Sequence, residues 1–351
     1  MEDQAEKLRE IMRQKNLSSG MSTPPEQGSE KIPGKSFERN TEKPLDRNAG
    51  KPVDRFSEKA AVRESVHLAG AGDRTERFTE NRRDQSKTRI ITVTSGKGGV
   101  GKTNISVNMA LAYARLGKKV VVMDADLGLA NVNVMLRMTP RYNLYHVIRK
   151  QKTMKEIMTE TDYGISIVAG ASGFSKIANL TEEERQNFIE ELETLSNADI
   201  IIIDTSAGVS SNVLDFIAAA DDAVIVTTPE PTAITDAYGI IKIIATEYDE
   251  LNLGLKLVVN RVKGAADAKK VADRMITIAG QFLNLKVDYL GFIYDDPLVS
   301  QAVLKQKPFM AMDPRSKASI CIQHIVGKLE KSEPRLAGGF TSMLRRLFGR
   351  S

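Results

Sequence analysis

Residues 89–103, Arg-Ile-Ile-Thr-Val-Thr-Ser-Gly-Lys-Gly-Gly-Val-Gly-Lys-Thr, decide the fold of this chain. An apolar run typical of a buried strand leads directly into a glycine-rich loop that ends in Lys-Thr. Glycines let backbone N–H groups turn inward around a polyphosphate, and the helix that follows points its positive end at the same charge. The stretch therefore predicts a strand, a phosphate-binding loop over 96–103 and a helix.

Two side chains of this loop carry the predicted chemistry. Lys102 would reach the β- and γ-phosphates of a nucleotide, and the Thr103 hydroxyl would ligate Mg²⁺. The whole loop and the residue after it are the expected nucleotide contacts. They are Gly96, Lys97, Gly98, Gly99, Val100, Gly101, Lys102, Thr103 and Asn104.

From residue 88 onward the sequence alternates between strand and helix patterns. Apolar runs that predict strands lie at 89–94, 119–124, 164–169, 199–204, 222–227, 255–259 and 287–293. Stretches that predict helices lie at about 102–117, 181–196, 233–249, 266–282 and 314–330. Continuous apolar runs indicate strands that are buried on both faces. The pattern therefore predicts an α/β domain over 88–332, with a doubly wound, mostly parallel sheet flanked by helices.

Aspartates follow two of the predicted strands at the edge where such sheets bind ligands. Asp124 and Asp126 end the strand at 119–124, and Asp204 ends the strand at 199–204. Carboxylates beside a phosphate loop suit Mg²⁺ and water chemistry. An apolar run that closes on Asp is the Walker B pattern, so we expect Asp204 to hold Mg²⁺ through water. Asp124 is a second candidate for the metal.

The composition favours a soluble cytoplasmic protein. The chain has 351 residues, a net charge of +5 and one cysteine, Cys321. So mild a charge does not indicate nucleic acid as a partner, and one cysteine cannot form an intrachain disulfide or a C-x-x-C metal site. No apolar run reaches the ~18–20 residues of a transmembrane helix, and the N-terminus does not resemble a signal peptide.

The two ends of the chain differ from its centre. Residues 1–16 are helix formers with an apolar stripe at helical spacing, whereas residues 17–87 lack periodicity and predict a disordered linker. Residues 338–351 predict a basic amphipathic helix of the kind that lies in a membrane interface with anionic lipids. The predicted membrane contacts are Phe340, Met343, Leu344, Leu347, Phe348, Arg345 and Arg346.

Lys97 gives the loop a second lysine near its start, and the pattern Gly-Lys-Gly-Gly-Val-Gly-Lys-Thr resembles the deviant Walker A motif of the MinD/ParA ATPases. The resemblance covers about residues 88–330. It implies an ATPase that binds ATP or ADP with Mg²⁺ and forms a homodimer when ATP is bound. In such a dimer Lys97 would cross the interface and contact the nucleotide of the partner. Residues 227–232 resemble the turn of this family that leads into a dimer-interface helix.

The same resemblance implies roles for residues at the strand ends. Asp126 would orient the attacking water, and Asp124 would support that water or the metal. After the strand at 255–259, Asn260 would contact the base and Arg261 would stack nearby. The guanine-reading motif Asn-Lys-x-Asp is missing at this place, which favours adenine.

The first residues, Asp-Gln-Ala-Glu-Lys-Leu-Arg, resemble the motif Asp-Gln-Ala-x-x-Leu-Arg of the FlhG family (also YlxH or FleN) of MinD-like flagellar regulators. This resemblance implies control of flagellar number and placement. It also implies that the helix binds the GTPase FlhF and stimulates GTP hydrolysis, with Gln4 orienting water. Flagellar switch (C-ring) proteins are further implied partners. The residues implied in partner binding are Asp3, Gln4, Ala5, Leu8 and Arg9.

A MinD-like cycle would link the tail to nucleotide. One short amphipathic helix binds a membrane weakly, but two helices in an ATP-bound dimer gain by effective concentration. We therefore expect peripheral association with the inner face of the cell membrane. Two other functions stay open: a ParA-type DNA-partitioning ATPase, and a plain MinD-like ATPase that positions the cell-division site. The mild charge and the amphipathic tail argue against DNA, so no nucleic acid is expected as a partner.

Overall fold

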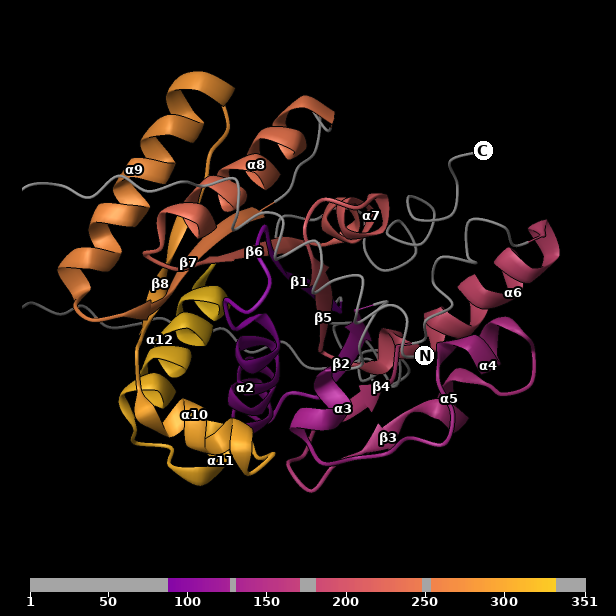
Figure 1. The fold of residues 1–351 in the computed structure, drawn as a ribbon. Coiled ribbons are helices and arrows are strands. Elements are labelled where there is room, and N and C mark those ends of the chain that lie inside the picture. The colour runs from indigo at the N-terminus through magenta and orange to yellow at the C-terminus, as the bar shows by residue number, and fades with distance from the viewer. Residues whose placement is uncertain (1–87, 127–130, 171–180, 248–253, 333–351) are drawn as a thin grey trace, which may run out of the picture. The chain divides into compact units, whose positions relative to one another are not determined.

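The computed structural model describes residues 88–126, 131–170, 181–247 and 254–332 (Figure 1). Within these ranges eight strands form one sheet in the order β3-β4-β2-β5-β1-β6-β7-β8. Neighbouring strands run parallel, except that β3 and β4 are antiparallel. The strands are β1 (Arg89–Ser95), β2 (Val120–Ala125), β3 (Thr159–Glu160), β4 (Ser166–Val168), β5 (Ile200–Ala207), β6 (Asp222–Thr227), β7 (Gly254–Val262) and β8 (Asp288–Tyr294).

Helices cover both faces of this sheet. They are α2 (Lys102–Arg115), α3 (Asn131–Met135), α4 (Leu144–Ile148), α5 (Met154–Ile157), α6 (Glu182–Glu193), α7 (Ser211–Ala219), α8 (Pro231–Glu247), α9 (Ala265–Leu283), α10 (Pro297–Leu304), α11 (Phe309–Met312) and α12 (Lys317–Lys331), with a 3₁₀ helix, η2, at Thr194–Asn197. Helices α2, α3 and α10 to α12 lie on one face and α4 to α9 on the other (Figure 1). The predicted doubly wound sheet is confirmed.

The central strands are largely apolar because each side of the sheet has its own core. On β1, Ile91 and Val93 pack with α2 and α12, while Ile90 packs into the core of the opposite face. On β5, Ile202 and Ile203 divide between the same two cores. Alternate residues of a strand point to opposite faces, so a strand covered on both sides is buried at every position. A polar residue there needs a hydrogen-bond partner, as Thr92 of β1 has in the Phe216 carbonyl at 3.0 Å.

The sequence analysis missed the short helices and the short edge strand. Helix α7 (Ser211–Ala219) runs through an apolar stretch that continues almost directly into β6, so no break separates helix from strand in the pattern. Helices α3, α4, α5 and α11 have four or five residues each, too few for a helical period to show. Strand β3 has two residues and pairs with β4 at the edge of the sheet.

Three predicted segments lie outside the described residues: the helix at 1–16, the linker at 17–87 and the membrane helix at 338–351. The two helices and the linker predicted for these segments therefore stay predictions. Among the described residues, no helix has both the length and the apolar character that crossing a bilayer requires.

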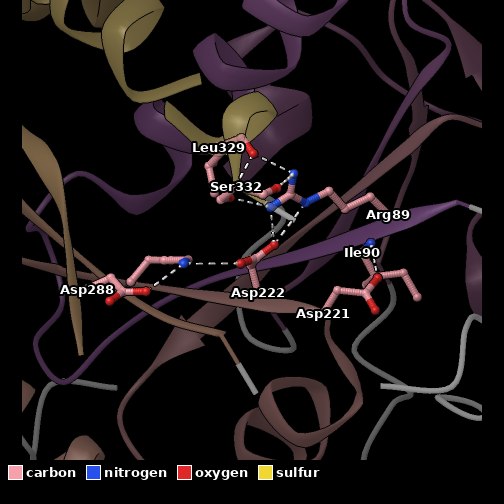
Figure 2. A network of polar contacts seen from close by, with 8 residues as sticks. Arg89, Ile90, Asp221, Asp222, Asp288, Leu329 and Ser332 are labelled. Carbon is pink, nitrogen blue, oxygen red and sulfur yellow. Dashed lines mark hydrogen bonds and ion pairs between the residues drawn. The ribbon is translucent and has the colours of Figure 1, made fainter. Parts of the chain in front are cut away.

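A buried ionic network links the amino ends of four neighbouring strands to the end of α12. Figure 2 shows the Arg89 guanidinium between the Asp222 carboxylate, at 2.6 Å, and the Leu329 carbonyl oxygen, also at 2.6 Å. Lys256 lies 3.9 Å from Asp222 and 2.9 Å from Asp288. The network thus joins β1, β6, β7 and β8 to α12 at the end of the sheet where these strands begin. The phosphate loop lies at the other end, after β1.

Replacing Arg89 by Ala should destabilise the fold by about 3 kcal/mol, because the buried Asp222 carboxylate would lose its closest cation. Urea unfolding measures this loss. Lys286→Ala is the matched control, since it removes the exposed partner of Asp288 at 3.5 Å, and it should cost under about 0.5 kcal/mol. Equal losses in the two variants would show that the network does not hold the strands together.

Candidate active site

The phosphate loop lies between β1 and α2, with its backbone open toward solvent. Gly99 and Gly101 have left-handed φ angles of 76° and 102°, which a residue with a side chain adopts at a cost. A Cβ at Gly98 or Gly99 would meet nothing within 4 Å, whereas a Cβ at Gly101 would lie 2.4 Å from Asn260 Nδ2. The predicted cradle is therefore present: its mouth is lined by backbone, and its base packs against β7.

The first residues of α2 connect the loop to the end of β5. Thr103 Oγ1 donates to Asp204 Oδ2 at 2.7 Å, and Ser106 Oγ donates to Asp204 Oδ1 at 2.8 Å. The sequence analysis missed Ser106, although it follows Thr103 by one helical turn and so falls on the same helix face. Together the two hydroxyls fix the orientation of the fully buried Asp204 carboxylate.

Burial controls the protonation of the two acids at the carboxyl ends of β5 and β2, Asp204 and Asp124. It raises the pKa of Asp204 to about 6, against the opposing effect of the two hydroxyl hydrogen bonds. It also raises the pKa of Asp124 to about 7, and the negative charge of Asp204 adds to that rise. The two residues are register partners on the paired strands β2 and β5. A cation placed between these acids would reverse both shifts.

Lys102 is the nearest buried cation. Burial lowers the pKa of its ammonium, while the charges of Asp204 and Asp126 act in the opposite direction. It is the first residue of α2, where the positive end of the helix also favours an anion. Because Lys102 directly follows the glycine loop and is buried, a phosphate bound by the loop would compensate its charge, as the sequence predicts.

Asp124 and Asp126 differ in their surroundings. Asp124 accepts hydrogen bonds from the backbone amides of Asp126 and Val132, both at 3.1 Å, so its carboxylate shapes the chain after β2. Asp126 Oδ2 accepts from Asn131 Nδ2 at 3.0 Å. Residues 127–130 between them are outside the described part. That Asp126 orients water and Asp124 holds the metal stays a prediction.

The donor set fits a magnesium nucleotide. Among the described residues, no three His, Cys, Asp or Glu side chains gather into a metal cage. Mg²⁺ is commonly held by one or two protein oxygens together with phosphate oxygens and water, and the Thr103 hydroxyl and the Asp204 carboxylate supply such oxygens. Bound Mg²⁺ would neutralise charge on the β- and γ-phosphates. Lys102 and the loop amides would hold the phosphates, so these residues act by position and charge.

Asn260 on β7 supports the phosphate loop through a hydrogen bond to its backbone. Its amide nitrogen donates to the Val100 carbonyl at 2.7 Å, and its amide oxygen accepts from the Arg261 backbone N–H at 2.9 Å. Arg261 is exposed and has a φ of 56°, in the left-handed region. The structure therefore places the Asn260 side chain against the phosphate loop, and Arg261 follows it at the end of β7. Their contact with a base stays a prediction.

Asn104 and Lys97 complete the predicted nucleotide contacts. Asn104 lies in the first turn of α2, and its carbonyl accepts from Asn108 Nδ2 at 2.7 Å. Lys97 instead points away from its own loop, toward the turn before α8. The predicted residues of the N-terminal helix and of the membrane helix lie outside the described residues.

Replacing Asp204 by Asn should stabilise the nucleotide-free protein more at pH 8 than at pH 5. Burial raises the pKa of Asp204 to about 6, above that of an unfolded chain, so the full cost of the acid is present above about pH 6, where the folded state must hold a buried carboxylate. Below that pH the folded carboxyl is neutral while the unfolded chain is still ionised, so the cost decreases with falling pH and disappears only below the ordinary pKa of an aspartate. We expect a gain of about 1–3 kcal/mol at pH 8, measured by urea unfolding at both pH values.

The same variant should lose the stabilisation that Mg²⁺ with ATP gives to the unmodified protein, because the carboxylate that would hold the metal is gone. Asp199→Asn is the control: this residue accepts from the Lys119 amide near the surface, outside the site, so the variant should keep the stabilisation by Mg²⁺ with ATP. A gain of the same size at pH 5 and pH 8 for Asp204→Asn would contradict the burial argument.

Comparisons with known proteins agree with this site. A family model described as "AAA domain" matches residues 88–257. The chain is 36% identical to "Antiactivator FleN" of Pseudomonas aeruginosa over 242 residues, covering 69% of this chain and 86% of that protein. It is also 36% identical to "Flagellum site-determining protein YlxH" of Helicobacter pylori over 248 residues, covering 70% and 83%.

Among solved structures, the septum site-determining protein MinD from Pyrococcus horikoshii, complexed with Mg-ADP, is similar with a TM-score of 0.57 and 25% identity. The match covers 72% of this chain and 98% of that one. The similar protein binds a magnesium nucleotide, as the donor set described above would. From the loop, the acids at the strand ends and these relatives, the chain belongs to the FleN/YlxH group of the MinD/ParA family of Mg²⁺-dependent ATPases.

Proposed function

We propose that this ATPase is a switch that cycles between a cytosolic monomer and an ATP-bound, membrane-associated homodimer. The observation that carries the proposal is the position of Lys97. This lysine belongs to the phosphate loop by sequence, yet its ammonium lies on Glu230 and Thr232 rather than in its own cradle. Its side chain is 37% exposed, so it is available to a second subunit.

Hydrolysis would depend on dimerisation. The residues of one subunit position the phosphates and the metal, but charge still develops on the γ-phosphate in the transition state. Lys97 from the partner would supply the missing cation, as an arginine finger does when it is provided in trans. An isolated subunit would then hydrolyse ATP slowly and a dimer faster.

The biological role would be control of flagellar number and placement. The relatives from Pseudomonas aeruginosa and Helicobacter pylori support this, since one is named an antiactivator and the other a flagellum site-determining protein. The motif at residues 3–9 supports the finer proposal that the N-terminal helix stimulates the GTPase FlhF. Flagellar C-ring proteins would be the targets of the dimer.

Membrane association would follow from the tail. The helix proposed at 338–351 has an apolar face and arginines, which suits an anionic membrane surface. With two tails per dimer, ATP binding would become membrane binding by effective concentration. The protein would then act at the inner face of the cell membrane and return to the cytosol after hydrolysis.

Lys97→Ala should abolish the dimer that forms with Mg²⁺ and a non-hydrolysable ATP analogue, because the cation that crosses the interface is removed. Light scattering after size exclusion measures the mass, and nucleotide binding by the monomer should survive because Lys102 is untouched. Lys118→Ala, which removes an exposed lysine 3.8 Å from Glu330, is a control that should dimerise normally. A Lys97→Ala protein that still dimerises would refute the proposed role.

Two variants should separate the two terminal segments. Gln4→Ala should lose stimulation of GTP hydrolysis by FlhF but still co-sediment with anionic vesicles and ATP, because only the proposed water-orienting residue changes. Leu347→Glu should lose co-sedimentation but still stimulate FlhF, because it places a charge on the apolar face of the tail.

The experiments on FlhF stimulation and on vesicle binding also distinguish the proposed function from its two alternatives. If the unmodified protein binds vesicles but does not stimulate FlhF, the chain acts as a plain MinD-like ATPase. If it sediments with DNA and not with vesicles, it acts as a ParA-type partitioning protein.

A further inference from the structure

The positive charge of this chain is concentrated in one short stretch. The whole chain has a net charge of +5, and residues 137–155 contain six Lys or Arg side chains but no Asp or Glu. The six cations are Arg137, Arg141, Arg149, Lys150, Lys152 and Lys155. Without them the chain would be close to neutral, so its excess of positive charge belongs to this stretch.

These cations surround two short helices, α4 and α5. Both helices turn their apolar residues inward, where one core buries Leu144, Val147, Ile148, Met154 and Ile157. Five of the six cations are exposed, and Lys152 is half-buried. The packing of the inner side therefore holds the charged side toward solvent.

Aromatic rings connect the cations on either side of α4. The rings of Tyr142 and His146 meet edge to face with centroids 5.2 Å apart, and the Tyr145 ring lies 6.2 Å from that of His146. Lys152 Nζ lies 4.7 Å from the Tyr142 ring centroid, and Arg149 Cζ lies 5.4 Å from that of Tyr145. We call the resulting patch the cationic surface; it consists of Arg141, Tyr142, Arg149, Lys150, Lys152 and Lys155.

Carboxylates of the protein neutralise only part of the cationic surface. Lys150 lies 2.8 Å from Glu183, and Lys152 lies 2.8 Å from Glu156. Both pairs are open to solvent, where an ion pair is weak. Within the described part of the chain, the other three cations form no ion pair with a carboxylate: Arg141, Arg149 and Lys155. The surface therefore keeps positive charge for an anionic partner.

We propose that the cationic surface is a second contact with an anionic membrane, used together with the C-terminal tail. This inference rests on the proposed function, in which the tail brings the ATP-bound dimer to the membrane. It adds a contact in the folded domain, made by charge and by the exposed edge of Tyr142.

The chemistry of the surface favours lipid headgroups. A single short anchor binds a membrane reversibly, and a polybasic surface is a common second signal. Tyrosine rings favour the membrane–water interface, and Tyr142 is 36% exposed. A nucleic-acid site would use open aromatic faces to stack bases. Here Lys152 and Arg149 already lie over the rings of Tyr142 and Tyr145, so these faces are occupied by the protein's own cations.

The location of the surface suits a membrane-bound dimer. Figure 1 shows α4 and α5 beside β3 and β4, whereas α8, which follows the turn that holds Lys97, packs on β6. Lys155 lines a hollow with Val120 and Ser166, the first residues of β2 and β4. The end of α12 lies at the same end of the sheet, where the Leu329 carbonyl accepts from Arg89 of β1. The tail follows α12, so both contacts can meet one membrane.

The test is the double variant Arg141→Gln with Arg149→Gln in the full chain, with Mg²⁺, a non-hydrolysable ATP analogue and vesicles that contain phosphatidylglycerol. Each cation near an anionic leaflet strengthens binding by about fivefold, so co-sedimentation should weaken by at least about tenfold. The variant should still form the dimer, because neither residue lies at the phosphate loop.

The matched control is Lys269→Gln with Lys270→Gln. It removes two exposed cations from α9, which packs on β7 and β8 at the other side of the sheet. The net charge changes equally in the two double variants, but the control should leave vesicle binding almost unchanged. Equal losses in both would show that overall charge acts and not this surface, and the proposal would be wrong.

Salt separates the cationic surface from the tail. The loss caused by Arg141→Gln with Arg149→Gln should shrink as salt rises, because salt screens exposed charges. The loss caused by Leu347→Ser should persist, because it removes apolar contact from the tail and no charge. A loss in the double variant that does not depend on salt would contradict a charge-based contact.

The remaining outcomes distinguish this inference from the proposed function. If the unmodified protein binds vesicles and the Arg141 and Arg149 double variant binds them equally well, the inference is wrong while the proposed function stands. If the double variant loses binding to DNA but not to vesicles, the surface is a nucleic-acid site and the inference is also wrong. If the unmodified protein does not bind vesicles at all, the membrane cycle and this inference both fail.

Discussion

The hydrogen bonds that Thr103 and Ser106 donate to Asp204 are the interaction on which the site depends. They join the helix after the phosphate loop to β5, whose Asp204 is the predicted metal ligand. The same helix begins with the buried Lys102, and Asp204 is the register partner of Asp124 on β2. The carboxyl ends of the strands therefore hold buried charges of both signs, and a bound magnesium nucleotide would neutralise them.

The buried charges at the two ends of the strands differ in how far they are neutralised. At the amino ends of the strands, Arg89, Asp222, Lys256 and Asp288 neutralise one another and serve stability. At the carboxyl ends, burial raises the pKa values of Asp124 and Asp204, and the negative charge of Asp204 adds to the rise at Asp124. A site that carries an unfavourable charge in the folded state costs stability in exchange for affinity.

The main strands and the loop could be predicted from sequence because each depends on local residues. Continuous apolar runs mark buried strands, and glycines at 98, 99 and 101 are what an open backbone cradle requires. The contacts of Lys97 could not be predicted, because Glu230 and Thr232 lie more than 130 residues along the chain and meet the loop only where α8 packs on Gly96. The brace from Asn260 to Val100 is a long-range contact of the same kind.

In the proposed dimer, the Lys97 ammonium leaves the Glu230 carboxylate of its own subunit and contacts the phosphates bound to the other subunit. A crystal structure of the full chain with Mg²⁺ and a non-hydrolysable ATP analogue tests this most directly. The account predicts a face-to-face pair in which each Lys97 ammonium has left Glu230 and lies against the phosphates of the other subunit. A single subunit with Mg²⁺ and nucleotide bound, and with the Lys97–Glu230 contact intact, would contradict it.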